Sequence, residues 1–372
     1  MRTSWRVFKI FDIDIRIDSS WIFIFGLITW ALAGHYFPSQ YPGWSPWQYW
    51  GVGIAASVLL FASVLAHELT HSLVARSRGE EVRSITLFIF GGVAEIAHEP
   101  ETAGKEFVIS LAGPLSSLVI AFMFFGIWIA MRGASVPIAA LARYLTIINV
   151  LLALFNMIPG FPLDGGRVLR AIAWKITGNL KRATRIASIS GQAVAFVLIV
   201  FGVFQILKGF FFNGLWISLI GWFIHSGATR GYREVLVKEM LKDVRVKDIM
   251  DTTFETIEGS ISVQELMEEY ILKKRERVFL VTEDGDLAGI VCLDDVKAVS
   301  AGKRKDTTVK DIMTPSDSLE TVSQEDDGGE VLARLASGKI NQVPVIEAGK
   351  IKGIVCRSNI LDFLHLRTEL GV

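Results

Sequence analysis

The sequence is poor in charge, in cysteine and in histidine. Only 20% of its 372 residues are charged while 51% are hydrophobic, and it holds two cysteines and six histidines. Cys292 and Cys356 are too few and too late in the chain for a disulfide scaffold or a cysteine zinc cluster, so we expect a reducing compartment around them. No basic stripe with interleaved aromatic residues occurs, and nucleic acid is therefore not expected as a partner.

The few charges are divided unevenly along the chain. Residues 1–240 carry 20 Lys and Arg against 13 Asp and Glu, whereas residues 241–372 carry 18 against 25. So little charge cannot cover a water-soluble surface, which indicates that the first region lies in a bilayer. The second region has the size and composition of a soluble domain.

Six apolar stretches of the first region are long enough to cross, or nearly cross, a membrane. They cover residues 21–37, 49–75, 107–131, 136–158, 186–207 and 210–224. The N-terminal arm, the tail and the connections on their side hold 17 Lys and Arg, and the connections on the opposite side hold 3. The excess of basic residues predicts that both termini lie in the cytoplasm, and we expect a multi-pass protein of the plasma membrane.

Two connections differ from simple loops. Residues 84–96 are β-branched and aromatic around Gly91 and Gly92, which predicts a strand or hairpin at the membrane surface whose edge can accept an extended peptide. Residues 156–166 contain Pro159 and Pro162, and they break a helix near the membrane beside Asp164. Irregular backbone at that depth must be buried in protein or line a wet cavity.

The sequence His67-Glu-Leu-Thr-His71 carries the clearest chemistry. Residues four apart share one face of a helix, so both imidazoles can hold one Zn²⁺, and Glu68 can accept a proton from a metal-bound water. The alternative is that these side chains only pair with their neighbours. Ionisable residues inside a membrane are costly and usually functional, which favours the metal site.

Two histidines leave a catalytic zinc ion one protein ligand short. Asp164 is the carboxylate at the end of a broken apolar segment, and we assign His67, His71 and Asp164 as ligands with water in the fourth position. Four further acidic residues and one histidine cluster in a surface connection and are expected to be solvated: Glu95, His98, Glu99, Glu101 and Glu106.

These motifs, with residues 110–115 (Ser-Leu-Ala-Gly-Pro-Leu) and the Asn-x-x-Pro-x-x-Pro-Leu-Asp-Gly run that starts at Asn156, resemble the site-2 protease family of intramembrane zinc metalloproteases. The resemblance covers most of residues 1–225. It implies cleavage of another membrane protein within or near a transmembrane helix, with Glu68 as general base and acid. It also implies that Asn156 helps to hold the scissile carbonyl or its oxyanion, and that the strand at Gly91 and Gly92 aligns the substrate. For Asn156, a hydrogen bond between helices remains an equal alternative.

The soluble region is a repeat. Residues 246–250 (Val-Lys-Asp-Ile-Met) recur at 309–313, and residues 289–292 (Gly-Ile-Val-Cys) recur at 353–356, which indicates a duplicated α/β unit of about 60 residues. The repeat resembles a tandem pair of CBS domains. The resemblance implies an adenosine nucleotide between the copies with Asp295 on its ribose, or a purely dimerising module, and a homodimer through the pair.

The sequence thus predicts a polytopic α-helical membrane domain over residues 1–225, with about six transmembrane helices and a short β element at the membrane surface. A linker over 226–245 and a cytoplasmic α/β tandem CBS module over 246–372 follow, with copies at about 246–302 and 309–368. The predicted function is an intramembrane zinc endopeptidase acting on a transmembrane protein in the lipid bilayer. A CBS-regulated channel or transporter and a catalytically silent scaffold are the alternatives, and a channel leaves His67, Glu68 and His71 unexplained.

Overall fold

The computed structural model describes residues 4–96, 100–242, 244–274, 277–283, 286–338, 342–347 and 350–370. The chain forms two compact units, an N-terminal unit of residues 1–235 and a C-terminal unit of residues 236–372. The region predicted as a linker, 226–245, is helical up to Leu241, because α8 (Phe211–Leu241) runs through the division between the units.

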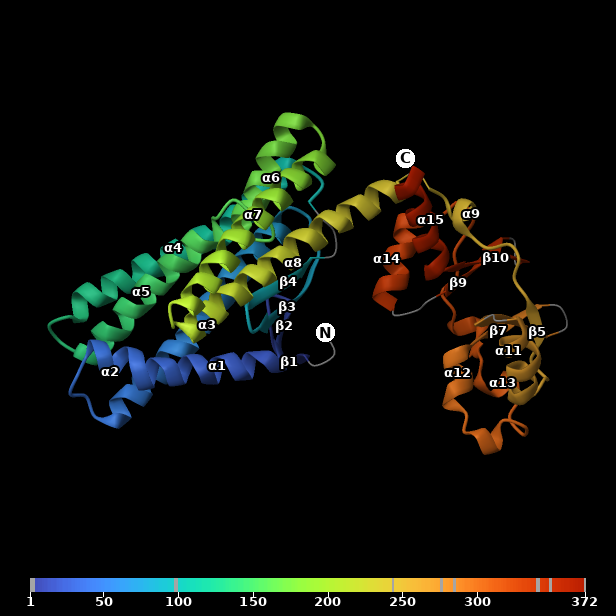
Figure 1. Cartoon of the computed structure of the whole chain (residues 1–372), viewed down its shortest axis with the longest axis horizontal. Coiled ribbons are helices and arrows are strands. Elements are labelled where there is room, and N and C mark those ends of the chain that lie inside the picture. The colour runs from blue at the N-terminus through green and yellow to red at the C-terminus, as the bar shows by residue number, and fades with distance from the viewer. Residues whose placement is uncertain are drawn as a thin grey trace. The chain divides into compact units, whose positions relative to one another are not determined.

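The N-terminal unit is built mainly from long apolar helices (Figure 1). Its helices besides α8 are α1 (Ser19–Ala31), the π-helical turn η1 (Leu32–Tyr36), α2 (Phe37–Gln40), α3 (Pro46–Ser77), α4 (Ala103–Met131), α5 (Val136–Asn156), α6 (Asp164–Thr177) and α7 (Leu180–Leu207). Among the described residues, five segments are long and apolar enough to cross a membrane, namely Ser19–Gln40, α3, α4, α5 and α7. The sixth predicted segment forms the first half of α8, which is not among these five. The prediction of a polytopic helical domain is confirmed, with the number of crossings approximate.

Helices α3, α4 and α7 begin earlier than the apolar stretches because polar caps precede their apolar residues. Ser45 and Gln48 form a capping box at the start of α3. The Thr102 hydroxyl accepts from the backbone N–H of Lys105 at the start of α4, and the Asn179 side chain caps α7 in the same way. Each cap satisfies backbone donors that the first helical turn leaves without partners.

A four-stranded sheet lies beside these helices, in the order β1 (Ser4–Ile10), β2 (Ile13–Asp18), β3 (Val82–Phe88) and β4 (Gly91–Ile96). The hairpin predicted over residues 84–96 is present as β3 and β4. The prediction missed the β1–β2 hairpin, although Ile13 and Ile15 alternate with charged residues and are buried. β2 pairs with β3 in parallel and β3 with β4 antiparallel, so β4 ends the sheet.

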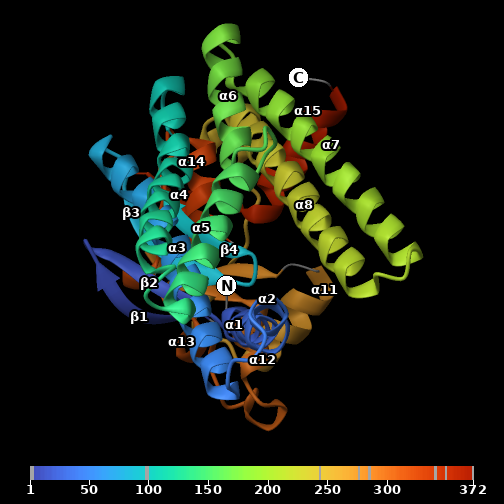
Figure 2. The ribbon, with the colours of Figure 1, turned by 90° about the vertical axis from the view of Figure 1, so that its left-hand side faces the viewer.

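Helix α4 occupies a central place in the N-terminal unit. It packs along α3, α5 and α6, and Figure 2 shows it from the side that faces left in Figure 1. Helix α4 thus lies against both elements that carry the predicted metal ligands, α3 with the two histidines and α6 with Asp164.

The C-terminal unit has the α/β content that the repeat predicts. Its strands are β5 (Thr256–Glu258), β6 (Val278–Glu283), β7 (Asp286–Cys292), β8 (Thr314–Pro315), β9 (Gln342–Glu347) and β10 (Lys350–Cys356). Its helices are α9 (Val246–Ile249), α10 (Val263–Glu265), η2 (Leu266–Ile271), α11 (Leu272–Lys274), α12 (Leu293–Ala298), η3 (Ala301–Lys303), α13 (Val309–Ile312), η4 (Ser316–Ser318), α14 (Gly328–Gly338) and α15 (Arg357–Leu370).

The two copies exchange their first segments. Val246 and Ile249 of α9 are buried in the core of the second copy, and Asp251 bridges to Ile354 of β10. In the same way, Val309 of α13 is buried in the core of the first copy, and Thr314 pairs with Ile290 of β7. The sequence copies at about 246–302 and 309–368 therefore interlock and are not separate folded bodies.

Candidate functional site

The three predicted metal ligands meet at one point. The Nε2 atoms of His67 and His71 are 3.2 Å apart, and each lies 3.1 Å from Oδ2 of Asp164. Donor atoms around a tetrahedral zinc ion, held by bonds of about 2.0–2.1 Å, lie roughly 3.3 Å from one another. Two neutral imidazole nitrogens and a carboxylate at this spacing are thus a donor set that fits Zn²⁺.

Helix α4 orients both imidazole rings from behind. Nδ1 of His71 donates to the backbone carbonyl of Ile109 at 2.6 Å, and Nδ1 of His67 lies 2.9 Å from the Ser117 hydroxyl. A carbonyl oxygen can only accept, so Nδ1 of His71 carries a proton and Nε2 is the nitrogen left to bind a metal. Such partners fix the tautomer and the ring orientation of metal-binding histidines.

The space in front of the two rings depends on Gly113 of α4. A Cβ atom at this position would lie 2.1 Å from Nε2 of His71 and 2.6 Å from Nε2 of His67. The side chain of any larger residue would therefore occupy the space that a metal ion bound to both nitrogens needs. The Ala-Gly-Pro element of the sequence is a signal for Gly113, but the sequence analysis assigned no role to Gly113, Ser117 or Ile109.

Glu68 lies beside the triangle and against the edge strand. It follows His67 on α3, and a Cβ atom at Gly92 of β4 would come within 2.5 Å of Glu68 Cγ. Among the described residues, no strand pairs with the outer edge of β4. The predicted general base and the predicted substrate strand at Gly91 and Gly92 are thus neighbours. Gly91 has a φ of +132°, a conformation that favours glycine.

Close backbone packing places Asp164 at the first residue of α6. A Cβ at Gly166 would lie 2.2 Å from the carbonyl carbon of Gly160, and one at Gly191 of α7 would lie 2.0 Å from the Phe161 carbonyl oxygen. The backbone N–H of Phe161 donates to Ala187 of α7. The predicted helix break thus packs closely against α7, with Gly160 and Phe161 buried and Pro159 exposed, which agrees in part with the need of irregular backbone within a membrane for protein packing or a wet cavity.

Asn156 is the last residue of α5, directly before this loop, and it is half-buried. Within the described residues its side chain makes no hydrogen bond, so the helix–helix alternative gains no support. Asn149, also on α5, makes such a bond instead, donating to the Ser63 hydroxyl of α3 at 3.2 Å. An oxyanion role for Asn156 stays a prediction.

The expectation that all the neighbouring carboxylates are solvated is wrong for Glu106. Glu95 and Glu101 are exposed, and His98 and Glu99 lie outside the described residues. Glu106 is only 2% exposed, because Arg170 of α6 donates to it from Nε at 2.6 Å. Arg170, counted among the cytoplasmic connection charges, is itself 3% exposed. The stretch between the fourth and fifth predicted apolar segments, residues 159–185, is expected to be a connection, whereas most of it forms the amphipathic helix α6 and the start of α7.

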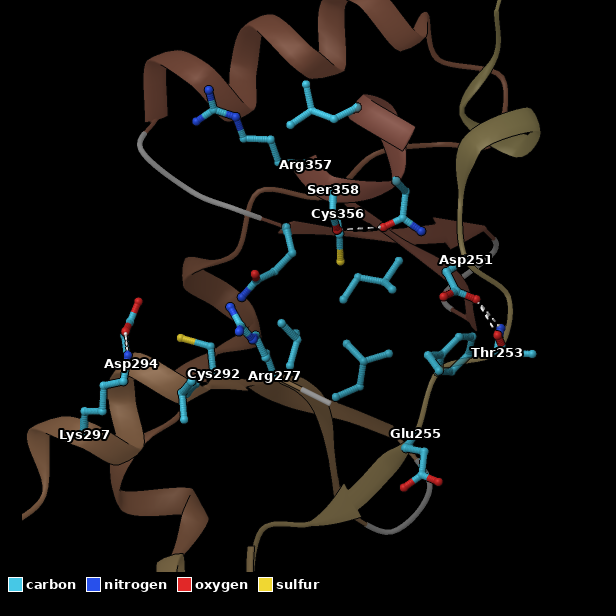
Figure 3. A pocket seen from close by; sticks show the side chains of 18 residues that line it. Asp251, Thr253, Glu255, Arg277, Cys292, Asp294, Lys297, Cys356, Arg357 and Ser358 are labelled. Atoms are coloured by element: carbon cyan, nitrogen blue, oxygen red, sulfur yellow. Dashed lines mark hydrogen bonds and ion pairs between the residues drawn. The ribbon is translucent and has the colours of Figure 1, made fainter. Parts of the chain in front are cut away.

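The C-terminal unit has a cleft of about 720 Å³ between its two copies (Figure 3). Arg277, Lys297 and Arg357 line it together with the apolar Phe254 and Ile354. Both chain cysteines also line this cleft, each at the same place in its copy.

Asp295, predicted to contact a ribose, holds the start of α12. Its Oδ2 accepts from the backbone N–H of Cys292 at 2.7 Å and from the Cys292 thiol at 2.9 Å. The neighbouring residue Asp294 is among the described residues that line the cleft, and it forms an ion pair with Lys297. The ribose contact at Asp295 stays a prediction.

Comparison with known proteins agrees with both units of this architecture. The family model described as Peptidase family M50 matches residues 55–142 and 133–202, and the CBS domain model matches residues 246–302 and 309–366. A protein named putative zinc metalloprotease Rip3 from Mycobacterium tuberculosis is 35% identical over 370 residues, covering 98% of this chain and 94% of that protein. The chain belongs to peptidase family M50.

Other relatives of this M50 peptidase extend over the whole chain. The zinc metalloprotease MJ0392 of Methanocaldococcus jannaschii is 31% identical over 376 residues, covering 100% of this chain and 99% of that protein. A solved structure, the site-2 protease from Methanocaldococcus jannaschii, is 29% identical and covers 62% of this chain and 95% of that one with a TM-score of 0.44. The predicted site-2 protease resemblance, the CBS pair and Zn²⁺ as the family's cofactor are confirmed. A channel or transporter gains no support from these relatives.

Proposed function

We propose that this M50 peptidase is an intramembrane zinc endopeptidase that cleaves a peptide bond within or near a transmembrane segment of another membrane protein. The triangle of His67, His71 and Asp164 with Glu68 beside it carries the proposal. Helix α3, which bears three of these residues, is long and apolar enough to span a membrane. The proposed reaction therefore takes place at membrane depth.

His67, His71 and Asp164 would hold the zinc ion, which when bound lowers the pKa of a water molecule and polarises the scissile carbonyl. Glu68 would accept a proton from the attacking water and deliver it to the leaving amide nitrogen. Ser117 and the Ile109 carbonyl keep the imidazoles in one orientation throughout. We assign Asn156 to the substrate carbonyl or its oxyanion.

Strand β4 is the proposed support for the substrate. The amides of a transmembrane helix are already hydrogen-bonded to each other, so a substrate must unwind before its carbonyl can be attacked. Among the described residues the outer edge of β4 has no partner strand, so it offers backbone groups to the extended segment, as in recognition by strand addition. Because Gly92 contacts Glu68, a peptide added to β4 would pass next to the general base.

The orientation of the protein follows from its charges. The excess of Lys and Arg in alternate connections supports an orientation with both termini, and hence the CBS pair, in the cytoplasm of a plasma-membrane protein. This orientation requires the first half of α8 to cross the membrane as a sixth segment in addition to the five of the fold. Reporter fusions at the two termini test this orientation, and a terminus found outside the cell would overturn it.

We further propose that the CBS pair binds an adenosine nucleotide in the cleft of Figure 3 and regulates proteolysis. Arg277, Lys297 and Arg357 are cations suited to phosphate groups, and Phe254 offers a ring for stacking on a base. Titration of the full chain with AMP and ATP should show saturable binding that Arg357→Ala weakens. Absence of saturable binding would leave assembly of a homodimer as the role of the pair, which a mass measurement in detergent tests.

The central test of protease function uses Glu68→Gln with a model transmembrane substrate in liposomes. Bound zinc and cleavage products, identified by mass spectrometry, are measured side by side. We expect the variant to retain zinc and to lose cleavage, because the amide keeps the shape of the side chain but cannot accept the proton. Glu101→Gln, an exposed carboxylate of the same region, is the matched control and should keep both. Unchanged cleavage in Glu68→Gln would refute the mechanism.

A further inference from the structure

The candidate metal site is assembled from two separate pieces of the chain. His67 and His71 come from α3, whereas Asp164 is the first residue of α6 and lies 93 residues beyond His71. The three donor atoms approach within 3.1–3.2 Å, so the site depends on how α6 is held against the helices that carry and orient the histidines.

A buried ion pair joins α4 to α6 next to this site. Nε and Nη2 of Arg170 lie 2.6 and 2.5 Å from Oε1 of Glu106, and both side chains are at most 4% exposed. The guanidinium group also lies over the ring of Phe161, 5.0 Å from its centroid. Phe161 belongs to the loop that leads into Asp164. Arg170 therefore contacts this loop directly, and it lies on the same helix, α6, as the metal ligand Asp164.

The other end of the pair reaches the histidines. Glu106 lies one helical turn before Ile109, whose carbonyl accepts the proton of His71 Nδ1 at 2.6 Å. A shift of α6 along α4 would therefore change the separation between Asp164 and the ring nitrogens. Burying two charges removes them from water at a cost that their attraction often does not recover, so stability alone is a weak reason for the pair.

We infer that Glu106 and Arg170 are positioning residues of the metal centre, which fix the distance between the Asp164 carboxylate and the two imidazoles. This role rests on the proposed zinc site. The pair lies outside the set of three donors. It acts through the Ile109 carbonyl on one side and through the first turns of α6 on the other, as outer partners of metal ligands do.

The test measures zinc binding separately from folding and from activity. In the full chain in detergent, Glu106→Gln and Arg170→Met should each raise the Kd for Zn²⁺, measured by competition with a chelator, by about 10- to 100-fold. The visible absorption of bound Co²⁺, which reports ligand geometry, should change in the same variants. Thr29→Val removes a buried hydrogen bond between α1 and α3, at Ser57, and is the matched control with an unchanged Kd.

Variants that fold poorly do not prevent the test. The double variant Glu106→Leu/Arg170→Met removes both charges together and leaves neither one unpaired, so it should fold, yet it should retain the raised Kd. A lower unfolding temperature with the wild-type Kd and Co²⁺ spectrum would overturn the positioning role. If the wild type bound no zinc, the proposed function would fail with it; if Glu68→Gln lost cleavage while Glu106→Gln kept the wild-type Kd, only the positioning role would fail.

Discussion

Replacing Gly113 by alanine should weaken zinc binding strongly without unfolding the protein. The added methyl group would lie 2.1 Å from Nε2 of His71, about one metal–nitrogen bond length, and 2.6 Å from Nε2 of His67. To restore an ordinary contact of 3.4 Å to His71, α4 and the ring must move about 1.3 Å further apart. A misplacement of about 1 Å can cost roughly 100-fold in an active site. We therefore expect the Kd for Zn²⁺ to rise by at least ~100-fold, or about 2.7 kcal/mol.

The apo protein should not suffer in the same proportion. Alanine is favoured over glycine inside a helix by about 1 kcal/mol, which offsets some of the strain in the absence of metal. Gly126→Ala on the same helix is the matched control, since no atom lies within 4 Å of its Cβ position. Metal content, chelator competition and thermal unfolding are measured for both variants. A Gly113→Ala protein with the zinc affinity of the wild type would refute the placement of the metal between these two rings.

Three further predictions concern other contacts. Ser117→Ala removes the partner of His67 Nδ1 and should weaken zinc binding by about 10- to 100-fold, as measured by chelator competition. Gly92→Ala places a methyl against Glu68 Cγ, so cleavage should fall while zinc content stays constant; equal cleavage would separate β4 from the reaction. Burial, with the charge of Asp251 adding to it, disfavours the thiolate and raises the pKa of Cys356 to about 11. Its alkylation rate should thus keep rising through pH 10 and fall when a nucleotide fills the cleft, and a plateau near pH 9 would contradict this environment.

The chemistry-bearing residues of the metal site were predictable because local rules place them. A helix puts His67 and His71 on one face whatever surrounds it, and a broken apolar segment makes an isolated carboxylate such as Asp164 conspicuous. The residues that shape the site from α4 were not predictable in this way. Gly113 and Ser117 acquire their roles only where α4 crosses α3, and the contact of Ser117 spans 50 residues of sequence.

The burial of charged residues is the feature that the sequence predicted least well. Glu106 and Arg170 are residue types that usually lie on the surface. They form a buried pair because each is the other's partner, although 64 residues separate them in the sequence. The β1–β2 hairpin was missed for a related reason. Its parallel partner β3 follows in the sequence only after the whole of α3, and Ile15 pairs with Ile85. No neighbouring residues therefore indicate this pairing.

The exchanged first segments of the two CBS copies make the C-terminal unit a single cooperative body. Cutting the chain between the copies would leave each half without the segment that completes its core, since Val246 is buried in the second and Val309 in the first. Leu241, in the last turn of α8, belongs to the same core as Val246. A soluble fragment that begins at the first repeat motif would thus expose apolar surface. Unfolding of either copy should melt the other, and the last turn of α8 with it.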